Sequence, residues 1–541
     1  MRKNSILGLA QFLFWGYAAG LVERDDCDTI STTTIYIPTT IYAPAPNVTT
    51  TPELPPWNNA TTTTSLTTTS TISITGSLPF GNSSSISIPT SIPSGNTSSI
   101  SITTSVPIGN TSTSVALPPS ITPPTTSSGS GIPPKPSDPL GPPPPPPPGP
   151  FRGFKNAVYF TNWGVNSGYH PQELPVSELT HILYAFADID LDGTVKSSDP
   201  AIDLDKRYPR DSLSNRTSNV YGAVKQLYIH KKHNRNLKTL LSIGGWNYSP
   251  KFITVADSDA TRHQFATTAL KLITDWGFDG IDIDWEFPAN DIEKENFVRL
   301  LEACRHAFDR HSLLNALKYR FTISVASPAT PANYEKLDLA AMNKYVDTWN
   351  LMAYDYSGSW DTVSGHQANV FSYGADSTAS TRLSTDTALK YYEAHGIHPQ
   401  KIMMGLPVYG RSFEGTTGIG QNYSGIGEGG PQPGVWYYKD LPKAGAEELY
   451  DDVAKAAYSY DAGTKELISY DNVRSTTYKS EYLKWRNLGG AFFWEASGDK
   501  TGGQGLVNTM SKSLRWLDET PNNLHYPTSQ YHNIRMGMPG E

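Results

Sequence analysis

The residues best suited to chemistry lie in one short stretch, Asp279 to Glu286, which reads Asp-Gly-Ile-Asp-Ile-Asp-Trp-Glu. Side chains alternate across a β-strand, so Asp282, Asp284 and Glu286 are expected on one face and the apolar residues between them on the other. Crowded, buried carboxylates raise one another's pKa. A carboxyl group that stays protonated near neutral pH can serve as a general acid, and Glu286, nearest the C-terminal end of the strand, is the candidate.

Two other interpretations of this acidic stretch are a calcium site and a structural cluster of acids. A calcium loop needs a glycine turn and ligands converging from a curved backbone, whereas β-branched Ile and bulky Trp alternate with the acids here. Unpaired buried charges are costly, which argues against a purely structural cluster of acids. We therefore expect no metal and favour catalysis. Asp279, of opposite parity to the other acids, should support the turn into the strand or its electrostatics.

The start of the chain has the layout of a secretory signal. Arg2 and Lys3 precede an apolar run from Ile6 to Trp15, and small residues follow. The run is interrupted by a glutamine and is short for a membrane span, so a cleaved signal over residues 1–22 is favoured over a signal anchor. No second transmembrane segment is indicated, and we expect a secreted protein.

Residues 23–153 are predicted to be a disordered stalk. They consist mainly of Ser, Thr and Pro, and a short repeat ends in a sequon at Asn82, Asn96 and Asn110. This composition is typical of an O-glycosylated, mucin-like spacer. The proline run 142–148 is expected to form a stiff polyproline II segment.

Charge and cysteine content exclude several classes of protein. The formal net charge is −8 without a basic cluster, so nucleic acid is not an expected partner. Two cysteines, Cys27 and Cys304, cannot build a disulfide framework. Cys304 lies on an apolar stripe with helical spacing, which predicts an inert core residue. We expect no cofactor and a monomer.

From residue 154 onward, extended apolar runs alternate with helical ones, as in a parallel sheet wrapped by helices. Eight strands with helical crossovers predict an α/β fold, a TIM (β/α)8 barrel over residues 154–517, with its chemistry at the C-terminal ends of the strands. A C-terminal tail, 518–541, would follow. The predicted strands centre on 157–160, 181–186, 239–243, 280–285, 321–326, 348–353, 402–407 and 490–494.

The connection between the seventh and eighth strands is too long for an ordinary crossover. It contains the aromatic run Trp436-Tyr437-Tyr438 and a predicted hairpin of 457–461 with 466–470. We therefore predict an inserted α+β subdomain, about 412–478. It would either deepen a substrate cleft or merely cover helices.

Four motifs together resemble glycoside hydrolase family 18, the chitinases, over about residues 154–517. Asp279, Asp282, Asp284 and Glu286 fit the family's DxxDxDxE signature. Three further motifs are similar and appear in the family's order on predicted strands three, six and seven. They are Ser242-Ile243-Gly244-Gly245-Trp246, Met352-Ala353-Tyr354-Asp355, and Gly405-Leu406-Pro407-Val408-Tyr409-Gly410-Arg411.

The resemblance implies a secreted chitinase of the fungal class V or bacterial type, which carries such an insertion. The stalk suggests association with a fungal cell wall. Its substrates would be chitin and chitooligosaccharides. The implied reaction is endo-acting, retaining hydrolysis of β-1,4-N-acetylglucosamine linkages, in which the substrate's own acetamido group forms an oxazolinium ion.

The resemblance also implies residue roles. Glu286 would protonate the leaving oxygen and later act as base on water. Asp284 would orient the acetamido nitrogen, Tyr354 would donate a hydrogen bond to the acetamido oxygen, and Asp282 would hold a proton with Asp284. Structural or electrostatic support would come from Asp279, Ser242, Gly244 and Gly245.

Aromatic rings are expected to carry the sugars, because apolar sugar faces pack on flat π systems. Trp494 would lie under the sugar before the scissile bond, and Trp246 would contact the sugars after it. Trp163 and Tyr159 would line the cleft, with core packing an equal alternative for Tyr159. The remaining predicted substrate-binding residues are Met352, Tyr409, Asp355 and Arg411, the last two of which could instead pair with each other.

Two other functions stay open at this point. A chitin-binding, lectin-like wall protein would arise from this fold by loss of the proton donor, but Glu286 is present. An endo-β-N-acetylglucosaminidase acting on N-glycans would share the acidic motif. Such enzymes commonly lack the predicted insertion, which favours chitin as the substrate.

Overall fold

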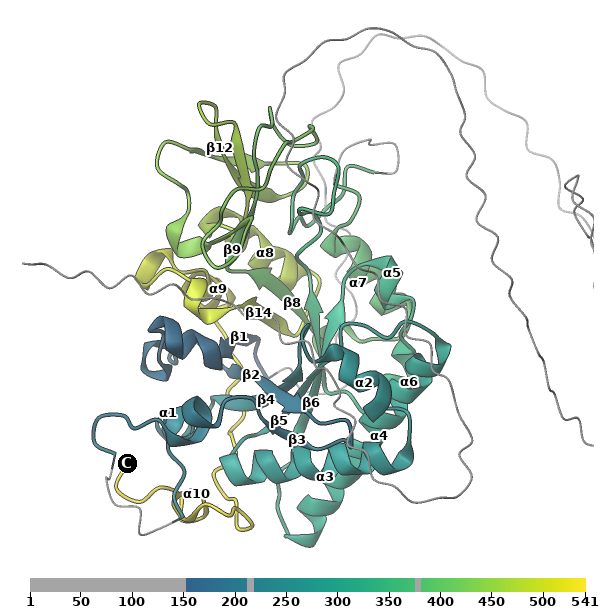
Figure 1. Ribbon diagram of the computed structural model, residues 1–541, viewed down its shortest axis with the longest axis vertical. Helices are drawn as coiled ribbons and strands as arrows, with labels where there is room; N and C mark the ends of the chain where they lie inside the picture. The colour runs from purple at the N-terminus through teal and green to yellow at the C-terminus, as the bar shows by residue number, and fades with distance from the viewer. Residues whose placement is uncertain (1–151, 212–217, 375–380) are drawn as a thin grey trace, which may run out of the picture. The chain divides into compact units, whose positions relative to one another are not determined.

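The computed structural model describes residues 152–211, 218–374 and 381–541. Its barrel strands are β1 (Lys155–Thr161), β2 (His181–Ile189), β4 (Lys238–Gly244), β5 (Gly280–Asp284), β6 (Thr322–Pro328), β7 (Thr348–Met352), β8 (Ile402–Pro407) and β14 (Gly490–Trp494). They are parallel and follow the spatial order β1-β14-β8-β7-β6-β5-β4-β2 (Figure 1). Because β2 pairs back with β1, the sheet is closed. The predicted TIM barrel is confirmed, and each predicted strand coincides with one of these eight.

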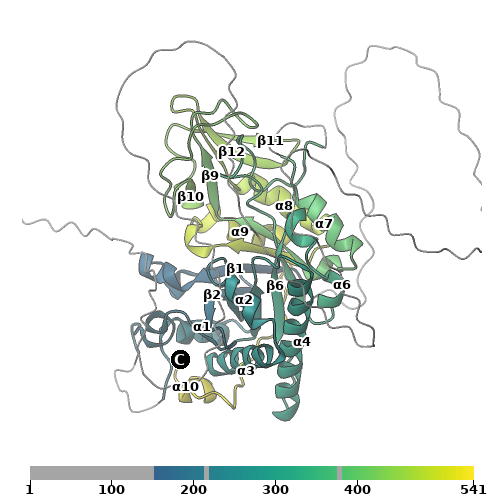
Figure 2. The ribbon, with the colours of Figure 1, turned by 45° about the vertical axis from the view of Figure 1, so that its right-hand side comes forward.

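Helices surround the barrel (Figures 1 and 2). The short strand β3 (Val195–Ser197) pairs antiparallel with the end of β2. The helices are α1 (Gly222–His233), α2 (Ser249–Val255), α3 (Asp259–Trp276), α4 (Asp291–Leu314), α5 (Pro331–Tyr334), α6 (Leu339–Met342), α7 (Thr385–Ala394), α8 (Val473–Trp485), α9 (Leu506–Leu514) and α10 (His532–Arg535).

α3 illustrates how the sequence sets these elements. Its apolar stripe, which includes Phe265 and Ile273, is buried in the main core. The helix ends at Gly277, whose φ is +73°, and a Cβ there would lie 2.4 Å from the Tyr228 ring. Only glycine combines this backbone conformation with such close packing.

β5 carries the acidic stretch. Ile281 and Ile283 point outward into the main core under the helices, and Asp282 is buried inside the barrel. The strand ends at Asp284, earlier than predicted. Glu286 therefore lies in the loop that follows the strand, at the C-terminal end of the barrel.

The part of the chain between β8 and β14 in sequence forms a second, antiparallel sheet. Its strand order is β10-β9-β13-β12-β11. Its strands are β9 (Tyr409–Phe413), β10 (Val435–Tyr437), β11 (Glu447–Asp451), β12 (Ala456–Asp461) and β13 (Glu466–Ser469). Figures 1 and 2 place this sheet beyond one end of the barrel. β12 and β13 form the predicted hairpin. The sheet starts at Tyr409, because β9 follows β8 almost directly, so its first strand begins before residue 412.

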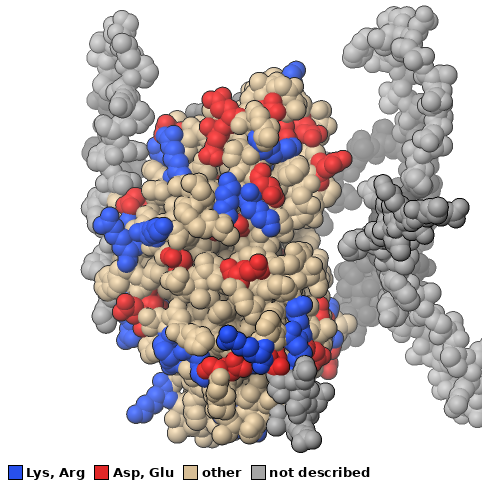
Figure 3. Space-filling model, turned by 90° about the vertical axis from the view of Figure 1, so that its left-hand side faces the viewer, with Lys and Arg blue, Asp and Glu red and all other residues tan. Residues whose placement is uncertain are grey.

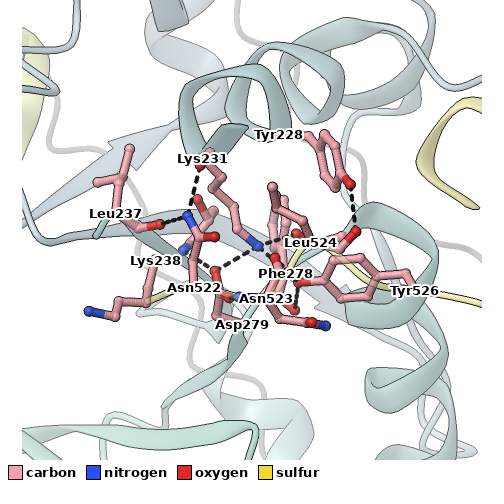
Figure 4. A network of polar contacts seen from close by, with 12 residues as sticks. Tyr228, Lys231, Leu237, Lys238, Phe278, Asp279, Asn522, Asn523, Leu524 and Tyr526 are labelled. Carbon is pink, nitrogen blue, oxygen red and sulfur yellow. Dashed lines mark hydrogen bonds and ion pairs between the residues drawn. The ribbon is translucent and has the colours of Figure 1, made fainter. Parts of the chain in front are cut away.

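Segment 518–541, predicted to be a tail, packs on the barrel at the N-terminal end of β5 (Figure 4). Asp279 and Lys231 form a fully buried ion pair of 2.7 Å. Asn523 donates its backbone N–H to Asp279, and the Tyr526 hydroxyl accepts from Lys231 and donates to the Phe278 carbonyl. Asp279 thus supports the turn into β5, and the C-terminal segment completes its surroundings.

Residues 1–151, which hold the predicted signal and nearly all of the stalk, lie outside the described residues. Within the described ranges, no helix has the length and apolar character that crossing a membrane requires. On the face shown in Figure 3, acidic and basic side chains are interspersed.

Candidate active site

Asp282 is the centre of a hydrogen-bond cluster inside the barrel. Its carboxylate accepts from Tyr159 Oη (2.8 Å), Ser242 Oγ (2.7 Å), Ser324 Oγ (2.7 Å) and Asn350 Nδ2 (3.0 Å). These donors come from four different strands, so closure of the barrel assembles them. Burial raises the pKa of Asp282, and the hydrogen bonds oppose the rise because they stabilise the ionised form.

Asp284 and Glu286 have environments that favour their protonated forms. Burial raises the pKa of Asp284 well above its usual range, and the charges of Glu286 and Asp282 raise it further. Burial, and then the charge of Asp355, raises the pKa of Glu286 to about 7. Glu286 can therefore hold a proton near neutral pH. In the part of the chain that the structure describes, Asp284 Oδ1 is buried without a hydrogen-bond partner.

The loop after β4 fixes the end of β5. Ser249 Oγ accepts from the Glu286 N–H (2.7 Å) and donates to the Asp284 carbonyl (3.3 Å), which also accepts from Gly245 N–H (2.9 Å). A Cβ on Gly244, whose φ is +111°, would lie 2.3 Å from the same carbonyl oxygen. Gly244 is therefore required by this close approach of two backbones.

Tyr354 and Asp355 follow β7 directly. Burial raises the pKa of Tyr354 well above its usual range, so its hydroxyl stays a donor. Asp355 Oδ1 accepts from Tyr409 Oη and from Arg411 Nε, each at 2.6 Å. Asp355 and Arg411 thus pair with each other, and the Asp355 side chain remains 37% exposed. Met352 is partly buried and packs in the same inner cluster as Tyr354.

Aromatic rings gather at the ends of β1, β2 and β14. Trp494 stacks on Phe186 with 5.7 Å between ring centroids, and Trp163, which is 46% exposed, lies 6.0 Å from Phe186. Tyr159 is different, because it is 2% exposed and donates to Asp282. Of the two alternatives stated for Tyr159, its burial and its hydrogen bond to Asp282 favour packing inside the closed barrel.

Two further tryptophans are open to solvent. Trp246 follows Gly245 and is 71% exposed. Trp360, in the loop after β7, is 55% exposed and lies 4.7 Å from the Arg411 guanidinium. Their exposed aromatic faces suit the apolar faces of sugars.

This arrangement can perform acid-catalysed cleavage of a glycosidic bond. It offers a protonated carboxyl near neutral pH, a second buried carboxyl and a tyrosine hydroxyl beside it, and aromatic surfaces around them. Among residues 152–211, 218–374 and 381–541, no group of three His, Cys, Asp or Glu side chains is arranged to hold a metal ion.

The sequence profile described as Glycosyl hydrolases family 18 matches residues 155–499. The chain belongs to glycosyl hydrolase family 18. "Endochitinase 1" of Metarhizium robertsii is 50% identical over 387 residues, which cover 71% of this chain and 91% of that one. "Chitinase 1" of Aphanocladium album is 49% identical with the same coverage. The solved structure of chitinase ChiA74 from Bacillus thuringiensis aligns with a TM-score of 0.63 and 28% identity, covering 68% of this chain and 71% of that one.

The four family 18 motifs quoted from the sequence meet around one site, although they lie far apart along the chain. The sequence reasoning missed several residues that the fold adds to it. Ser324 and Asn350 have inward parity on their strands, and Phe186 is the last residue of the predicted strand 181–186, as Trp494 is of 490–494, so strand position could have found all three. Ser249 begins α2 and Trp360 lies in the loop after β7, and neither carried such a signal.

Proposed function

We propose that this protein is an endo-acting chitinase, which hydrolyses β-1,4-N-acetylglucosamine linkages with retention by substrate-assisted catalysis. The observation that carries the proposal is that Glu286, whose pKa is raised to about 7, lies with Asp284, whose pKa burial also raises, and with the Tyr354 hydroxyl. The family and the relatives named endochitinase support chitin as the substrate.

The first step breaks the glycosidic bond. Glu286 gives its proton to the leaving oxygen as the bond from that oxygen to C1 breaks. The carbonyl oxygen of the substrate's own acetamido group bonds to C1 and forms an oxazolinium ion. Tyr354 donates to that carbonyl oxygen, and Asp284 Oδ1, which has no partner among the described residues, accepts from the acetamido N–H.

The second step restores the enzyme. Glu286, now ionised, takes a proton from a water molecule, which attacks C1 and opens the oxazolinium ring. Two inversions at C1 give net retention. Asp282 keeps a negative charge beneath Asp284, because four donors hold it, and this charge favours the protonated Asp284 of the resting site.

Binding and location are part of the same proposal. Trp494 would floor the site under the sugar that reacts, with Trp163 on the same side and Trp246 and Trp360 carrying the sugars after the cleaved bond. A signal over residues 1–22 and a glycosylated stalk over 23–153 would place the enzyme outside the cell or on a fungal wall. The support is their composition and the fungal relatives.

The central test is Glu286→Gln, which removes the acidic proton and almost no volume. We expect chitin hydrolysis to fall by at least about 10²- to 10⁴-fold, with oligosaccharide binding retained. Glu466→Gln is the matched control, because Glu466 is a buried carboxylate in the second sheet, paired with Lys443, and its variant should keep its activity.

Near wild-type turnover by Glu286→Gln would rule out this mechanism. Endo action predicts a rapid fall in the viscosity of a soluble chitin derivative, before monosaccharide accumulates. Activity on N-glycans without activity on chitin oligosaccharides would instead assign the protein as an endo-β-N-acetylglucosaminidase.

A further inference from the structure

Asp355 has a backbone conformation that needs outside support. Its φ is +59°, in the left-handed region that non-glycine residues rarely adopt. Such a conformation is retained only where the surrounding structure determines it, and it occurs most often at functional sites. Tyr409 and Arg411 hold the Asp355 side chain, but neither contact fixes the backbone on its C-terminal side.

Gln367 provides that contact from a distant part of the same loop. Its carbonyl oxygen accepts from the N–H of Tyr356, the residue after Asp355, at 2.9 Å. Its side-chain Nε2 donates to the carbonyl of Tyr409 at 2.8 Å and to the carbonyl of Ser469 at 3.1 Å. Gln367 thus joins the backbone beside Asp355 to the backbone of Tyr409, whose hydroxyl holds the Asp355 carboxylate.

The chemistry of this contact requires an amide. Two carbonyl oxygens face the end of the Gln367 side chain, and an amide NH₂ is the uncharged group that can donate to both of them. The residue is 0% exposed, and its backbone N–H donates to Ser469 Oγ at 3.0 Å. Burial of a polar side chain such as that of Gln367 costs free energy unless its donors make hydrogen bonds. Packing alone therefore does not explain a glutamine at this position.

We propose that Gln367 is a positioning residue of the active site, which holds the Asp355 carboxylate beside Glu286 by fixing the backbone on one side and Tyr409 on the other. The inference rests on the proposed function, since it assigns Gln367 a part in setting the proton affinity of the general acid. Gln367 lies outside the four family motifs and touches no substrate.

The charged and titratable groups around Asp355 and Glu286 determine how a loss of the Gln367 hydrogen bonds would change the pKa of Glu286. Glu286 faces Asp284 at the end of β5, and Tyr354 and Asp355 after β7. Asp355 faces Tyr409 and Arg411, both on β9. Release of Asp355 would let its carboxylate move toward solvent, away from Glu286. The repulsion that disfavours ionised Glu286 would then weaken, and its pKa would fall.

The test compares two variants that each remove a buried amide from the same segment. Gln367→Met keeps the length of the side chain and removes its donors. Asn369→Leu does the same at a residue that is also 0% exposed and donates to the carbonyls of Phe371 and Leu383, away from Asp355. Both should lower the melting temperature. Only Gln367→Met should move the basic limb of the profile of kcat/KM against pH to lower pH, by about half a unit or more.

A double-mutant cycle with Asp355→Asn separates positioning from general damage. Asp355→Asn removes the charge and should itself move the basic limb down. Gln367→Met in that background should add no further shift, because the charge it positions is gone. If Gln367→Met does not fold, Gln367→Asn replaces it, because the shorter side chain of asparagine cannot bring its amide to both carbonyls. The same shift of the basic limb to lower pH is expected.

Three outcomes would overturn the inference: a basic limb in Gln367→Met that stays at the wild-type pH, a shift equal to that of Asn369→Leu, or a shift additive with that of Asp355→Asn. The proposed function stands and the role of Gln367 fails if the wild type has a basic limb near pH 7, Asp355→Asn moves that limb, and Gln367→Met does not. If Glu286→Gln remains active, the proposed function itself fails.

Discussion

At the residue scale, the site separates three carboxyl groups that are close together in sequence. Asp282 has four donors, Asp284 has a buried oxygen without a partner among the described residues, and Glu286 lies beyond the end of the strand. The three carboxyl groups thus differ in proton affinity, because hydrogen bonding, burial and neighbouring charge differ at each position.

The proton affinity of Glu286 predicts the pH range of activity. Its pKa is raised to about 7, so the acid form is complete well below that pH and falls about tenfold per unit above it. We expect kcat/KM on a soluble chitin oligosaccharide to have a basic limb near pH 7. Initial rates between pH 4 and 9, with the fold monitored by circular dichroism, check this. Full activity at pH 9 in the folded protein would show that another group is the acid.

At this scale, alternation along one strand and the four motifs were enough to find the acids, Tyr354 and the glycines of the β4 loop. They could not place Tyr159, because a tyrosine on a barrel strand can point into the barrel or out of it. Ser249 and Gln367 act through contacts between segments distant in sequence, and no local pattern indicates these.

At the scale of elements, the C-terminal segment acts as part of the barrel. Asn522 donates to the carbonyls of Lys231 and Leu237 at the end of α1, while Asn523 and Tyr526 complete the surroundings of the Asp279–Lys231 pair (Figure 4). These contacts surround the N-terminal end of β5. The active site is at its other end, so the segment should govern stability more than chemistry.

Tyr526→Ala tests this division. The side chain is 1% exposed, and its loss leaves a cavity and removes a hydrogen bond to Lys231. We expect a loss of about 3–5 kcal/mol in the free energy of unfolding by urea, with kcat at 25 °C nearly unchanged. Met536→Ala, in the same segment but 57% exposed, should stay within about 0.5 kcal/mol of wild type. A large fall in kcat in folded Tyr526→Ala would mean that the N-terminal end of the barrel controls the active site.

The strands were predictable, whereas the role of the C-terminal segment was not. Strands buried on both faces read as short apolar runs, and eight of them are visible in the sequence. The segment is held instead by side-chain amides and hydroxyls that bond to backbone carbonyls. Its polar composition therefore resembles that of an exposed tail.

At the scale of the whole molecule, the barrel is closed without the first 151 residues. Phe154 N–H donates to the Trp516 carbonyl, and the Phe154 carbonyl accepts from Asp518 N–H. β1 then pairs with both β2 and β14. The described residues that build the site all follow this point in the chain.

A truncated protein that begins at Arg152 should therefore fold and cleave soluble chitin oligosaccharides at about the rate of the full chain. The reason is that every contact described for the site lies within residues 152–541. Melting temperature and kcat of both proteins, purified from the same host, provide the comparison. A truncated protein that is folded but much slower would show that the predicted stalk contributes to catalysis.

The closure of β1 on β14 has a consequence for biosynthesis. Lys155 pairs with Gly490, and the segment that surrounds Asp279 comes later still. A ribosome adds about 5–20 residues per second, so β1 waits roughly tens of seconds for its last neighbour to be made. During that time one edge of the nascent sheet is unpaired, which is the state in which chains aggregate. The demand for chaperones per molecule made should therefore rise as the chain is elongated more slowly.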